Sequence, residues 1–405
     1  MNKKWGILKA IRWGFFLDIN KKDNHNIKAN YFEINKDGKK ITQFFVNKDG
    51  FKKLEKIKND IENFSTAVAK QLEKKNKKIQ PPLLYNLTEL QRDANKYFGF
   101  SAEKTLQIAQ NLYEKHKLIS YPRTESQYLG EKNFPLAKNK LNLFLKHYNY
   151  SDIVDRKRLN PANKRVFNDK KLTDHHALIP LNLPDKSLSP AEEKIFNLIV
   201  KRFISVFCKD HEYEAVNIVF QVKDYNFEAN FKNISEQGWK KIYQDIEKEN
   251  KEDEVFLKDI KQGDEFLILD RILQEKETRP PFHYTDSSLL KDMSDPAKYI
   301  KDEKLKEVFK GDTGLGTQST RAGIIETLIK RDYARRKKRN IIITDKGIKL
   351  VEFLQKGKYT RQLLSPETTA QWEMALNTLQ KKDIKELYDN CVNYVKNFVK
   401  EIALL

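Results

Sequence analysis

The sequence predicts a multidomain α+β protein in which a β-rich domain is interrupted by a helical insert. Apolar and polar residues alternate near positions 30–47 and again between about 210 and 273, which is the pattern of half-buried strands. Between these regions, apolar residues recur at helical spacing, and the proline pairs Pro81-Pro82 and Pro280-Pro281 mark changes of pattern. We therefore expect three domains: a discontinuous β-rich domain of residues 16–80 and 208–279, a helical domain of residues 81–207, and a second helical domain of residues 280–405.

The first β region begins with a hairpin signal. Asp37-Gly38 separates two alternating runs within residues 30–47, and this dipeptide suits a tight turn between strands. Apolar residues at helical spacing then predict a helix over 51–63. A basic, strand-like segment follows and ends at the first proline pair. The second β region is predicted to open with strands over 215–222 and 225–231.

The helical insert is expected to present one tyrosine. A helix over 84–97 should stop at Gly99, and a second helix should start after Ser101 as its N-cap. That second helix leads to Tyr121. Pro122 ends any arriving helix and favours an extended conformation at Tyr121, so we expect this side chain on a short strand or loop.

The C-terminal part has a winged-helix-like order of elements. A basic turn over 334–340 separates a helix over 321–331 from a strand over 341–343. Such an element commonly meets a nucleic-acid backbone, although the basic run is equally typical of a solvated turn. Trp372 is expected in the core. The residues predicted to face inward from the helix are Ile324, Ile325, Leu328 and Ile329.

The composition favours a polyanionic partner. The 405 residues contain 77 Lys and Arg against 57 Asp and Glu, a formal net charge of +20. This surplus favours nucleic acid, while a lysine-rich solvated surface is the alternative that charge alone leaves open. Cys208 and Cys391 are the only cysteines, so neither a disulfide framework nor a cysteine zinc module is expected, and a reducing cytoplasm fits. The sequence predicts no signal peptide and no membrane span.

Tyr121 and Arg123 form the first candidate site. On an extended chain they share a face, which would place a guanidinium beside a phenol. Arginine binds phosphate oxygens in a fork, and a nearby cation favours the phenolate form of a group whose ordinary pKa is about 10. The pairing therefore suits phosphate chemistry.

Four motifs carry a resemblance to a known family. They are residues 119–129 (ISYPRTESQYL), 172–180 (LTDHHALIP), 314–333 (GLGTQSTRAGIIETLIKRDY) and 365–373 (SPETTAQWE). In this order they closely resemble type IA DNA topoisomerases of the topoisomerase III branch, and the combination is far more specific than any one motif. A tyrosine recombinase is a weaker alternative, because its tyrosine should follow most of the motifs.

The resemblance implies a padlock-shaped, toroidal enzyme in which the β-rich domain forms an arch. The domain with Tyr121 would lift away to open a gate in one DNA strand. Tyr121 would attack a backbone phosphate of a single-stranded region, form a 5′-phosphotyrosine link and release a 3′-hydroxyl. Because the covalent link stores the phosphodiester energy, no nucleotide triphosphate is required. Cytoplasmic, nucleoid-associated localisation is the corresponding expectation.

Roles for individual residues follow from the resemblance and from their chemistry. Arg123 would stabilise charge on the phosphate, and His176 would contact phosphate or handle a proton. A helix N-terminus suits phosphate at Thr320 and Arg321, and glycines allow close approach of the backbone. The two adjacent histidines are not expected to hold a metal ion. The residues expected to bind DNA are Thr124, Ser126, His175, Gly314, Gly316, Ser319, Thr320 and Arg321.

The chain departs from the family pattern in its acidic residues. Family members place a metal-binding Toprim domain with a D-x-D-x-E run and a catalytic lysine ahead of the arch, and no such run occurs in this sequence. We therefore expect residues 1–15 to be a remnant of the base domain and the implied Mg²⁺ to find no ligands here. Two hypotheses stay open: a strand-cleaving core that works with a Toprim domain on a separate polypeptide, and an incomplete fragment that only binds single-stranded DNA.

Overall fold

The computed structural model divides the chain into two compact units. The β unit comprises residues 1–80 and 209–282, and the helical unit comprises residues 81–208 and 283–405. The helical unit thus combines the two segments that were predicted as separate helical domains. The structure describes residues 11–21, 25–45, 49–172, 174–247, 260–278, 280–309, 314–377 and 384–405.

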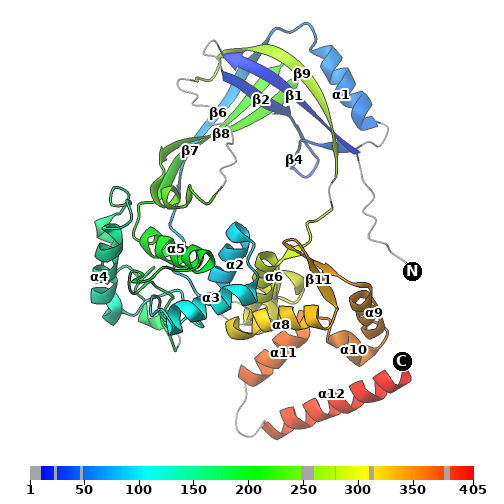
Figure 1. Cartoon of the computed structure of the whole chain (residues 1–405). Helices are drawn as coiled ribbons and strands as arrows, with labels where there is room; N and C mark the ends of the chain where they lie inside the picture. Colours follow the sequence, from blue (N-terminus) through cyan, green and yellow to red (C-terminus); the bar gives the residue numbers. More distant parts are fainter. Residues whose placement is uncertain are drawn as a thin grey trace. The chain divides into compact units, whose positions relative to one another are not determined.

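The β unit is built on one antiparallel sheet with the strand order β2-β8-β7-β6-β9-β1-β5 (Figure 1). Strand β1 also pairs with β2, the first strand of this order, so the strands from β2 to β1 are hydrogen-bonded in a closed ring. Strand β6 pairs with β7 and β9, and the sheet therefore joins the two sequence segments of the unit. The elements are β1 (Ile11–Lys21), β2 (His25–Tyr31), β3 (Glu33–Ile34), β4 (Lys40–Ile41), β5 (Phe44–Phe45), α1 (Asp49–Asp60), β6 (Thr66–Ile79), β7 (His211–Val222), β8 (Tyr225–Glu236), the 3-10 helix η4 (Gly238–Tyr243) and β9 (Glu265–Glu277).

Alternation along the strands sets the core of the β unit. Phe15, Leu17 and Ile19 of β1 are fully buried, and they lie two residues apart as one face of a strand requires. Helix α1 covers this core with Leu54 and Ile57. Residues 11–15 of the predicted base-domain remnant begin strand β1 of this sheet instead, while residues 1–10 lie outside the described residues.

The predicted hairpin, helix and strands of the β unit are confirmed at shifted boundaries. The hairpin reduces to β3 and β4, which pair across a turn that includes Gly38 with a φ of 74°. The helix predicted over 51–63 spans Asp49–Asp60, and the two strands predicted after residue 210 are β7 and β8. Hairpin, helix and strands are local features, which explains why periodicity found them.

The helical unit consists of helices joined by loops, with a small sheet beside α8 (Figure 1). Gly99 ends α2 in the left-handed conformation, and Ser101 accepts a hydrogen bond from Lys104 N, so both predicted helix boundaries are confirmed. The elements are α2 (Leu87–Phe98), α3 (Ala102–Glu114), η1 (Glu131–Asn133), α4 (Phe134–Leu145), η2 (Arg156–Arg158), η3 (Asp169–Lys171), α5 (Pro190–Ser205), β10 (Tyr284–Thr285), α6 (Asp286–Ser294), η5 (Pro296–Tyr299), α7 (Glu303–Val308), α8 (Gln318–Lys330), β11 (Ala334–Lys337), β12 (Asn340–Ile343), α9 (Asp345–Leu354), α10 (Lys358–Gln362), α11 (Pro366–Asn377) and α12 (Ile384–Leu404).

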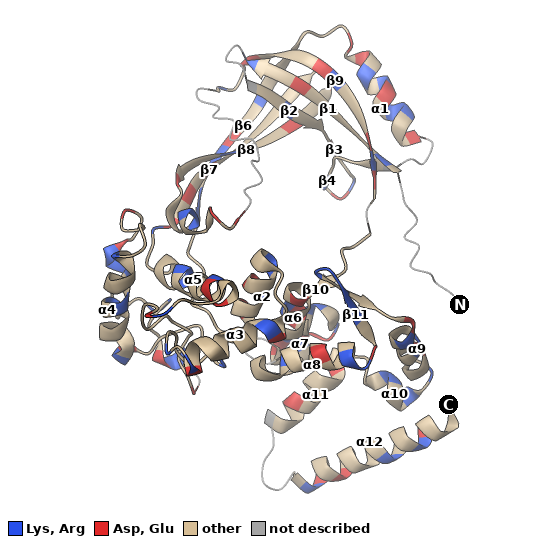
Figure 2. Ribbon diagram, in the orientation of Figure 1, with Lys and Arg blue, Asp and Glu red and all other residues tan. Residues whose placement is uncertain are grey.

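The segment predicted as a basic turn is mainly a strand. Strands β10, β12 and β11 form a small sheet beside α8, and β11 carries the basic residues (Figure 2). Arg336 points inward, where it donates to Asp286 at 2.8 Å and to Glu326 at 3.0 Å. Its neighbours Arg335 and Lys337 are exposed. Alternation along the strand therefore divides the basic run between a structural ion pair and the solvent.

Three apolar residues that were predicted to be buried are exposed. Ile324 and Leu328 of α8 are each 40% exposed, whereas Ile325, which was also predicted to face inward, is buried together with Ala322. Trp372 of α11 is 47% exposed and packs edge to face against Tyr394. When a helix has apolar residues on two faces, the elements packed against it determine which face is buried. The sequence pattern does not identify those elements.

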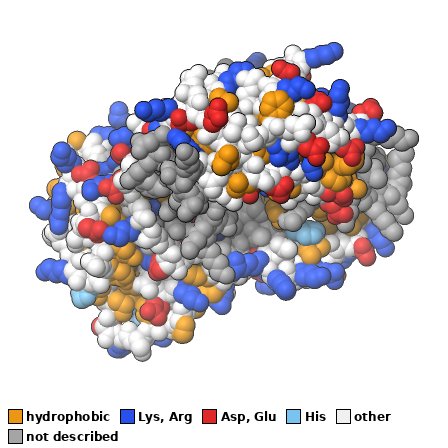
Figure 3. Space-filling model, turned by 90° about the horizontal axis from the view of Figure 1, so that it is seen from above, with side chains coloured by type: hydrophobic (Ala, Val, Ile, Leu, Met, Phe, Trp, Pro, Cys, Tyr) orange, Lys and Arg blue, Asp and Glu red, His pale blue; other side chains and the backbone are white. Residues whose placement is uncertain are grey.

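The charges are distributed over the surface. On the face that Figure 3 shows, Lys and Arg side chains are scattered among Asp and Glu and do not form one continuous patch. Within the described residues, none of the helices combines the length and apolar character needed to cross a membrane.

We expect the two cysteines to differ in reactivity. Cys208 is buried, its thiol donates to the carbonyl oxygen of Ile204, and burial raises the pKa of the thiol to about 12. Cys391 is exposed on α12. At pH 8 a thiol-alkylating reagent should modify Cys391 alone in the folded protein and both thiols in denaturant, as mass spectrometry would show. Native labelling that persists in Cys391→Ser would contradict this expectation.

Candidate active site

Tyr121 is presented by a loop that is tied to a second motif segment. After α3, Leu118 N donates to Leu112 O, and Ile119 then forms a bridge with Pro180. Ser120 N donates to Ile179 O at 2.9 Å. The next residue, Tyr121, is 36% exposed. Its location on a loop after a helix is as predicted, and the loop lies against residues 177–181.

The Ser120 side chain strengthens this connection. Its hydroxyl donates to the carbonyl oxygen of Ala177 at 3.2 Å and accepts from Ile179 N at 2.9 Å. Ser120 is buried, so water does not compete for these bonds. The segment that follows the two histidines is thereby fixed beside the tyrosine.

Two rings flank the Tyr121 phenol. The His175 ring lies with its centroid 4.6 Å from that of Tyr121, and the Tyr113 ring packs edge to face at 5.6 Å. The Tyr121 hydroxyl makes no hydrogen bond with any residue that the structure describes. The arrangement holds the ring in place and leaves the hydroxyl available to a ligand.

The two histidines lie differently relative to Tyr121. His175, predicted as a DNA contact, is the residue that packs against Tyr121. His176, predicted as catalytic, directs Nδ1 to the carbonyl oxygen of Ala177 at 2.7 Å. Because a carbonyl only accepts, Nδ1 carries the hydrogen, and Nε2 of His176 is the nitrogen available for another partner. His175 is thus the histidine whose ring contacts Tyr121, while both histidines line the same pocket, and their predicted roles stay predictions.

Arg123 is oriented by helix α3. With the Gln110 amide turned so that its oxygen faces the guanidinium, Gln110 accepts from Arg123 Nη2 at 3.0 Å and from Nε at 3.3 Å. Gln110 and Tyr113 are three residues apart and so share one face of α3. This face supplies two neighbours of the site that sequence reasoning did not assign to it. The sequence indicated the helical spacing of α3, but it did not indicate which loop this face of the helix contacts.

A pocket of about 240 Å³ adjoins the phenol. Lys132 lies in it on the short helix η1, and the bond from Glu131 N to Asp169 holds that helix in place. Sequence reasoning missed Lys132, because only the folded loops bring it to Tyr121. The residues that line the pocket are Tyr121, Lys132, Asn133, Leu172, Asp174, His175 and His176.

Thr124 and Ser126, both predicted to bind DNA, are buried and bonded within the protein. The Thr124 hydroxyl donates to His175 O, and the Ser126 hydroxyl contacts the carbonyl oxygens of Tyr128 and Lys171. Thr124 therefore fastens the tyrosine loop directly to the histidine segment. The geometry gives both hydroxyls a supporting role around the site.

The predicted residues at the start of α8 divide into an exposed and a buried group. Ser319 and Thr320 are exposed, and Thr320 Oγ1 caps the helix by accepting from Thr317 N at 2.9 Å. Arg321 is only 2% exposed and donates to Thr88 Oγ1 of α2. The Arg321 guanidinium is thus bound within the protein in this structure, and its predicted contact with DNA stays a prediction.

The two predicted glycines are required by the protein itself. A Cβ atom on Gly314 would lie 2.5 Å from Met293 O and 2.7 Å from Arg321 Nη2. Gly316 has a φ of 72°, which disfavours other residues. The groups that approach Gly314 in the structure belong to α6 and α8, and the predicted close approach of DNA to this glycine stays a prediction.

The side chains around Tyr121 have the chemistry that suits a phosphate-bearing ligand. A presented phenol adjoins a histidine and a pocket that contains lysine, and a held arginine follows two residues later. The family model described as DNA topoisomerase matches residues 15–387. The chain belongs to this family of type IA DNA topoisomerases.

Individual relatives agree with this assignment. DNA topoisomerase 3 of Bacillus licheniformis is 38% identical over 346 residues, covering 83% of this chain and 47% of the relative. DNA topoisomerase 3 of Pasteurella multocida is 35% identical over 325 residues, covering 79% of this chain and 48% of the relative. The chain thus spans about half the length of the curated relatives it matches. Full-length topoisomerase I from Thermotoga maritima has a similar fold, with a TM-score of 0.65 at 22% identity over 97% of this chain and 58% of that one.

Proposed function

We propose that the chain is the strand-cleaving core of a topoisomerase III-like enzyme, with Tyr121 as its nucleophile. The supporting observation is the position of Tyr121: a partly exposed phenol fixed between Tyr113 and His175 beside a pocket. Its hydroxyl oxygen attacks a backbone phosphorus of single-stranded DNA. A bond from phosphorus to Tyr121 forms, the bond to the 3′-oxygen breaks, and that oxygen takes up a proton to become a 3′-hydroxyl. The reverse reaction reseals the strand.

The surrounding residues support this reaction through charge and position. Arg123, held by Gln110, and Lys132 stabilise negative charge on the phosphate. His175 adjoins the phenol and assists transfer of its proton, while His176 offers Nε2 to the pocket. Ser319 and Thr320, exposed at the N-terminus of the 13-residue helix α8, bind a neighbouring phosphate. Thr124 and Ser126 support the loop, and Gly314 and Gly316 shape the approach to α8.

The family supports a larger proposal about strand passage. In a padlock-shaped enzyme, the part with Tyr121 moves while it stays bound to the 5′ end, and a second strand passes through the gap without ATP. Such an enzyme acts on DNA in the cytoplasm, in association with the nucleoid. The net charge of +20 supports attraction to an extended polyanion.

The family also implies Mg²⁺, and the residues near Tyr121 do not fit this ion. Across the part of the chain that the structure describes, no three His, Cys, Asp or Glu residues are grouped in a way that could hold a metal ion. Asp174 is the acidic residue of the pocket lining, together with Lys132 and two histidines. We therefore assign no step to a metal bound by these residues, and a separate Toprim polypeptide is an additional partner to test.

Trapping of covalent adducts tests the proposed function. The protein is incubated with single-stranded oligonucleotides and Mg²⁺, with and without an added Toprim domain, and the reaction is stopped with denaturant. A 5′-phosphotyrosine link predicts that protein stays attached to a 3′-labelled fragment and that a 5′-labelled fragment is released with a free 3′-hydroxyl. Salt-sensitive binding without adducts in any arm would instead identify a protein that only binds single-stranded DNA.

We expect Lys132 to contribute one phosphate contact. Lys132→Gln should weaken binding of a single-stranded oligonucleotide and reduce the slope of log affinity against log salt by about 0.7, the value for one lost contact. Fluorescence anisotropy at several salt concentrations measures both. Lys186→Gln, a change of an exposed lysine before α5, is the matched control. Equal slopes for Lys132→Gln and the parent chain would exclude this contact.

A further inference from the structure

Gln318, at the first turn of α8, joins two segments that are distant in sequence. Its Oε1 accepts from Thr88 N at 3.0 Å, and its Nε2 donates to Glu125 O at 3.3 Å. Thr88 belongs to the first turn of α2, and Glu125 lies four residues after Tyr121. The Gln318 side chain is only 8% exposed, so both ends of its amide are committed to the protein.

The two segments that Gln318 contacts are also joined to each other. Leu87 N donates to Thr124 O at 3.2 Å, and Asn86 Nδ2 donates to Glu125 O at 3.2 Å. The start of α2 and the loop of Tyr121 therefore form one layer. Gln318 holds this layer at two points.

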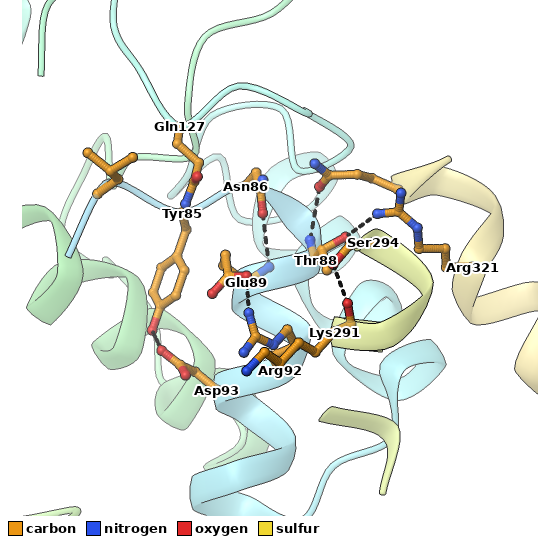
Figure 4. A network of polar contacts seen from close by, with 12 residues as sticks. Tyr85, Asn86, Thr88, Glu89, Arg92, Asp93, Gln127, Lys291, Ser294 and Arg321 are labelled. Carbon is orange, nitrogen blue, oxygen red and sulfur yellow. Dashed lines mark hydrogen bonds and ion pairs between the residues drawn. The ribbon is translucent and has the colours of Figure 1, made fainter. Parts of the chain in front are cut away.

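Arg321 adds a second connection from α8 to the same layer. Its Nη1 donates to Thr88 Oγ1 at 3.2 Å, and Figure 4 shows its side chain reaching from α8 to Thr88 at the start of α2. Gly314 leaves the room that the guanidinium occupies. Arg321 is thus a buried cation bound to the hydroxyl of a neighbouring segment.

Other hydrogen bonds also join residues 81–207 to residues 283–405. Ser287 N donates to Asn95 Oδ1, and Ala102 N donates to Asp286 Oδ1, each at 3.1 Å. The apolar cluster at this boundary receives Ala102 from the first segment, while its other buried members come from α6 and α8. Hydrogen bonds between segments exchange for bonds to water at little net cost, so such a boundary separates more readily than an apolar core.

We propose that Gln318 and Arg321 form a polar latch between α8 and the layer that carries Tyr121, and that release of this latch opens the DNA gate. This role rests on the proposed function, and it makes Gln318 a positioning residue for Tyr121. With the latch closed, the tyrosine loop is fixed relative to the start of α8. With the latch open, the covalently bound end moves away together with α2.

Hydrogen exchange tests the latch without requiring the reaction. In Gln318→Ala, the Thr88 amide loses its acceptor, and peptides over 86–90 and 122–127 should exchange roughly fivefold faster, as expected for one lost hydrogen bond. In Gln318→Glu, the carboxylate still accepts from Thr88 N but cannot donate to Glu125 O, so the first peptide should stay protected while the second exchanges faster. Gln107→Ala, a change of an exposed glutamine on α3, is the control. Unchanged exchange in Gln318→Ala would overturn the latch.

Adduct trapping then separates a latch from a structural support. A latch that opens more often delays resealing, so Gln318→Ala should raise the trapped adduct about twofold to fivefold. Its oligonucleotide affinity, measured in the Tyr121→Phe background, should stay the same. A lower adduct level together with faster exchange throughout the helical unit would overturn the latch and identify Gln318 as a structural residue. Absence of adducts from the parent chain would refute the proposed function, while the exchange results still decide whether the contact exists.

Discussion

Tyr121→Phe is expected to eliminate the proposed covalent attachment to DNA and to leave the fold intact. The change removes only the hydroxyl oxygen, and the ring keeps its contacts with Tyr113 and His175. The hydroxyl makes no hydrogen bond with the described residues, so its removal leaves no partner unsatisfied. Because the change removes the proposed nucleophile, adduct yield in denaturant-stopped reactions should fall by at least about 10³-fold. Binding of single-stranded DNA should continue.

Tyr113→Phe is the matched control for this prediction. Tyr113 is a phenol in contact with Tyr121, on a helix that precedes the site. Adducts should persist when its hydroxyl is removed. Adducts that survive in Tyr121→Phe but disappear in Tyr113→Phe would show that the nucleophile is Tyr113 and not Tyr121.

Asp93→Ala should destabilise the helical unit by about 3–5 kcal/mol, the usual effect of leaving a buried charge without its partner. Asp93 of α2 accepts hydrogen bonds from Arg202 of α5 and from the Tyr85 hydroxyl, the latter at 2.7 Å (Figure 4). The Arg202 guanidinium is nearly buried and lies 3.9 Å from the centre of the Tyr85 ring. Urea unfolding followed by tryptophan fluorescence and circular dichroism measures the loss.

An exposed ion pair supplies the control for this stability prediction. Lys164 and Glu131 pair on the surface, and Glu131→Ala should change the free energy of unfolding by less than about 1 kcal/mol. Asp93→Asn keeps an oxygen acceptor for Tyr85 but removes the charge. Its loss of unfolding free energy should lie between those of Asp93→Ala and Glu131→Ala. Equal midpoints and slopes for Asp93→Ala and Glu131→Ala would show that the buried pair contributes little.

The sequence was sufficient where a feature depends on neighbouring residues. Pro122 and the preceding helix located Tyr121 on an ordered loop, and Gly99 and Ser101 marked helix boundaries that the structure confirms. The motif order placed the histidine segment in the same site. The sequence did not indicate which of His175 and His176 packs against Tyr121, because this depends on how the segment lies against residues 118–121.

Long-range packing accounts for what the sequence did not reveal. The loops between α3 and α5 bring Lys132 to the pocket, and the sequence separation between Lys132 and Tyr121 does not predict that they lie close together. Arg321 stands in a motif that suits a phosphate contact, yet its guanidinium is buried against Thr88. Ile324 and Leu328 have the pattern of buried residues but lie on the face of α8 that the small sheet and α6 leave uncovered.

In the proposed reaction, the hydrogen bonds of Ser120 would determine which residues move together. They join the tyrosine loop to residues 177–181, so under the proposed function the bound 5′ end would move with His175, while Ser319 and Thr320 remain on α8. The groups proposed to rejoin the strand would then be divided between two parts of the helical unit. On this proposal, the strand is rejoined only after the part with Tyr121 has returned to α8.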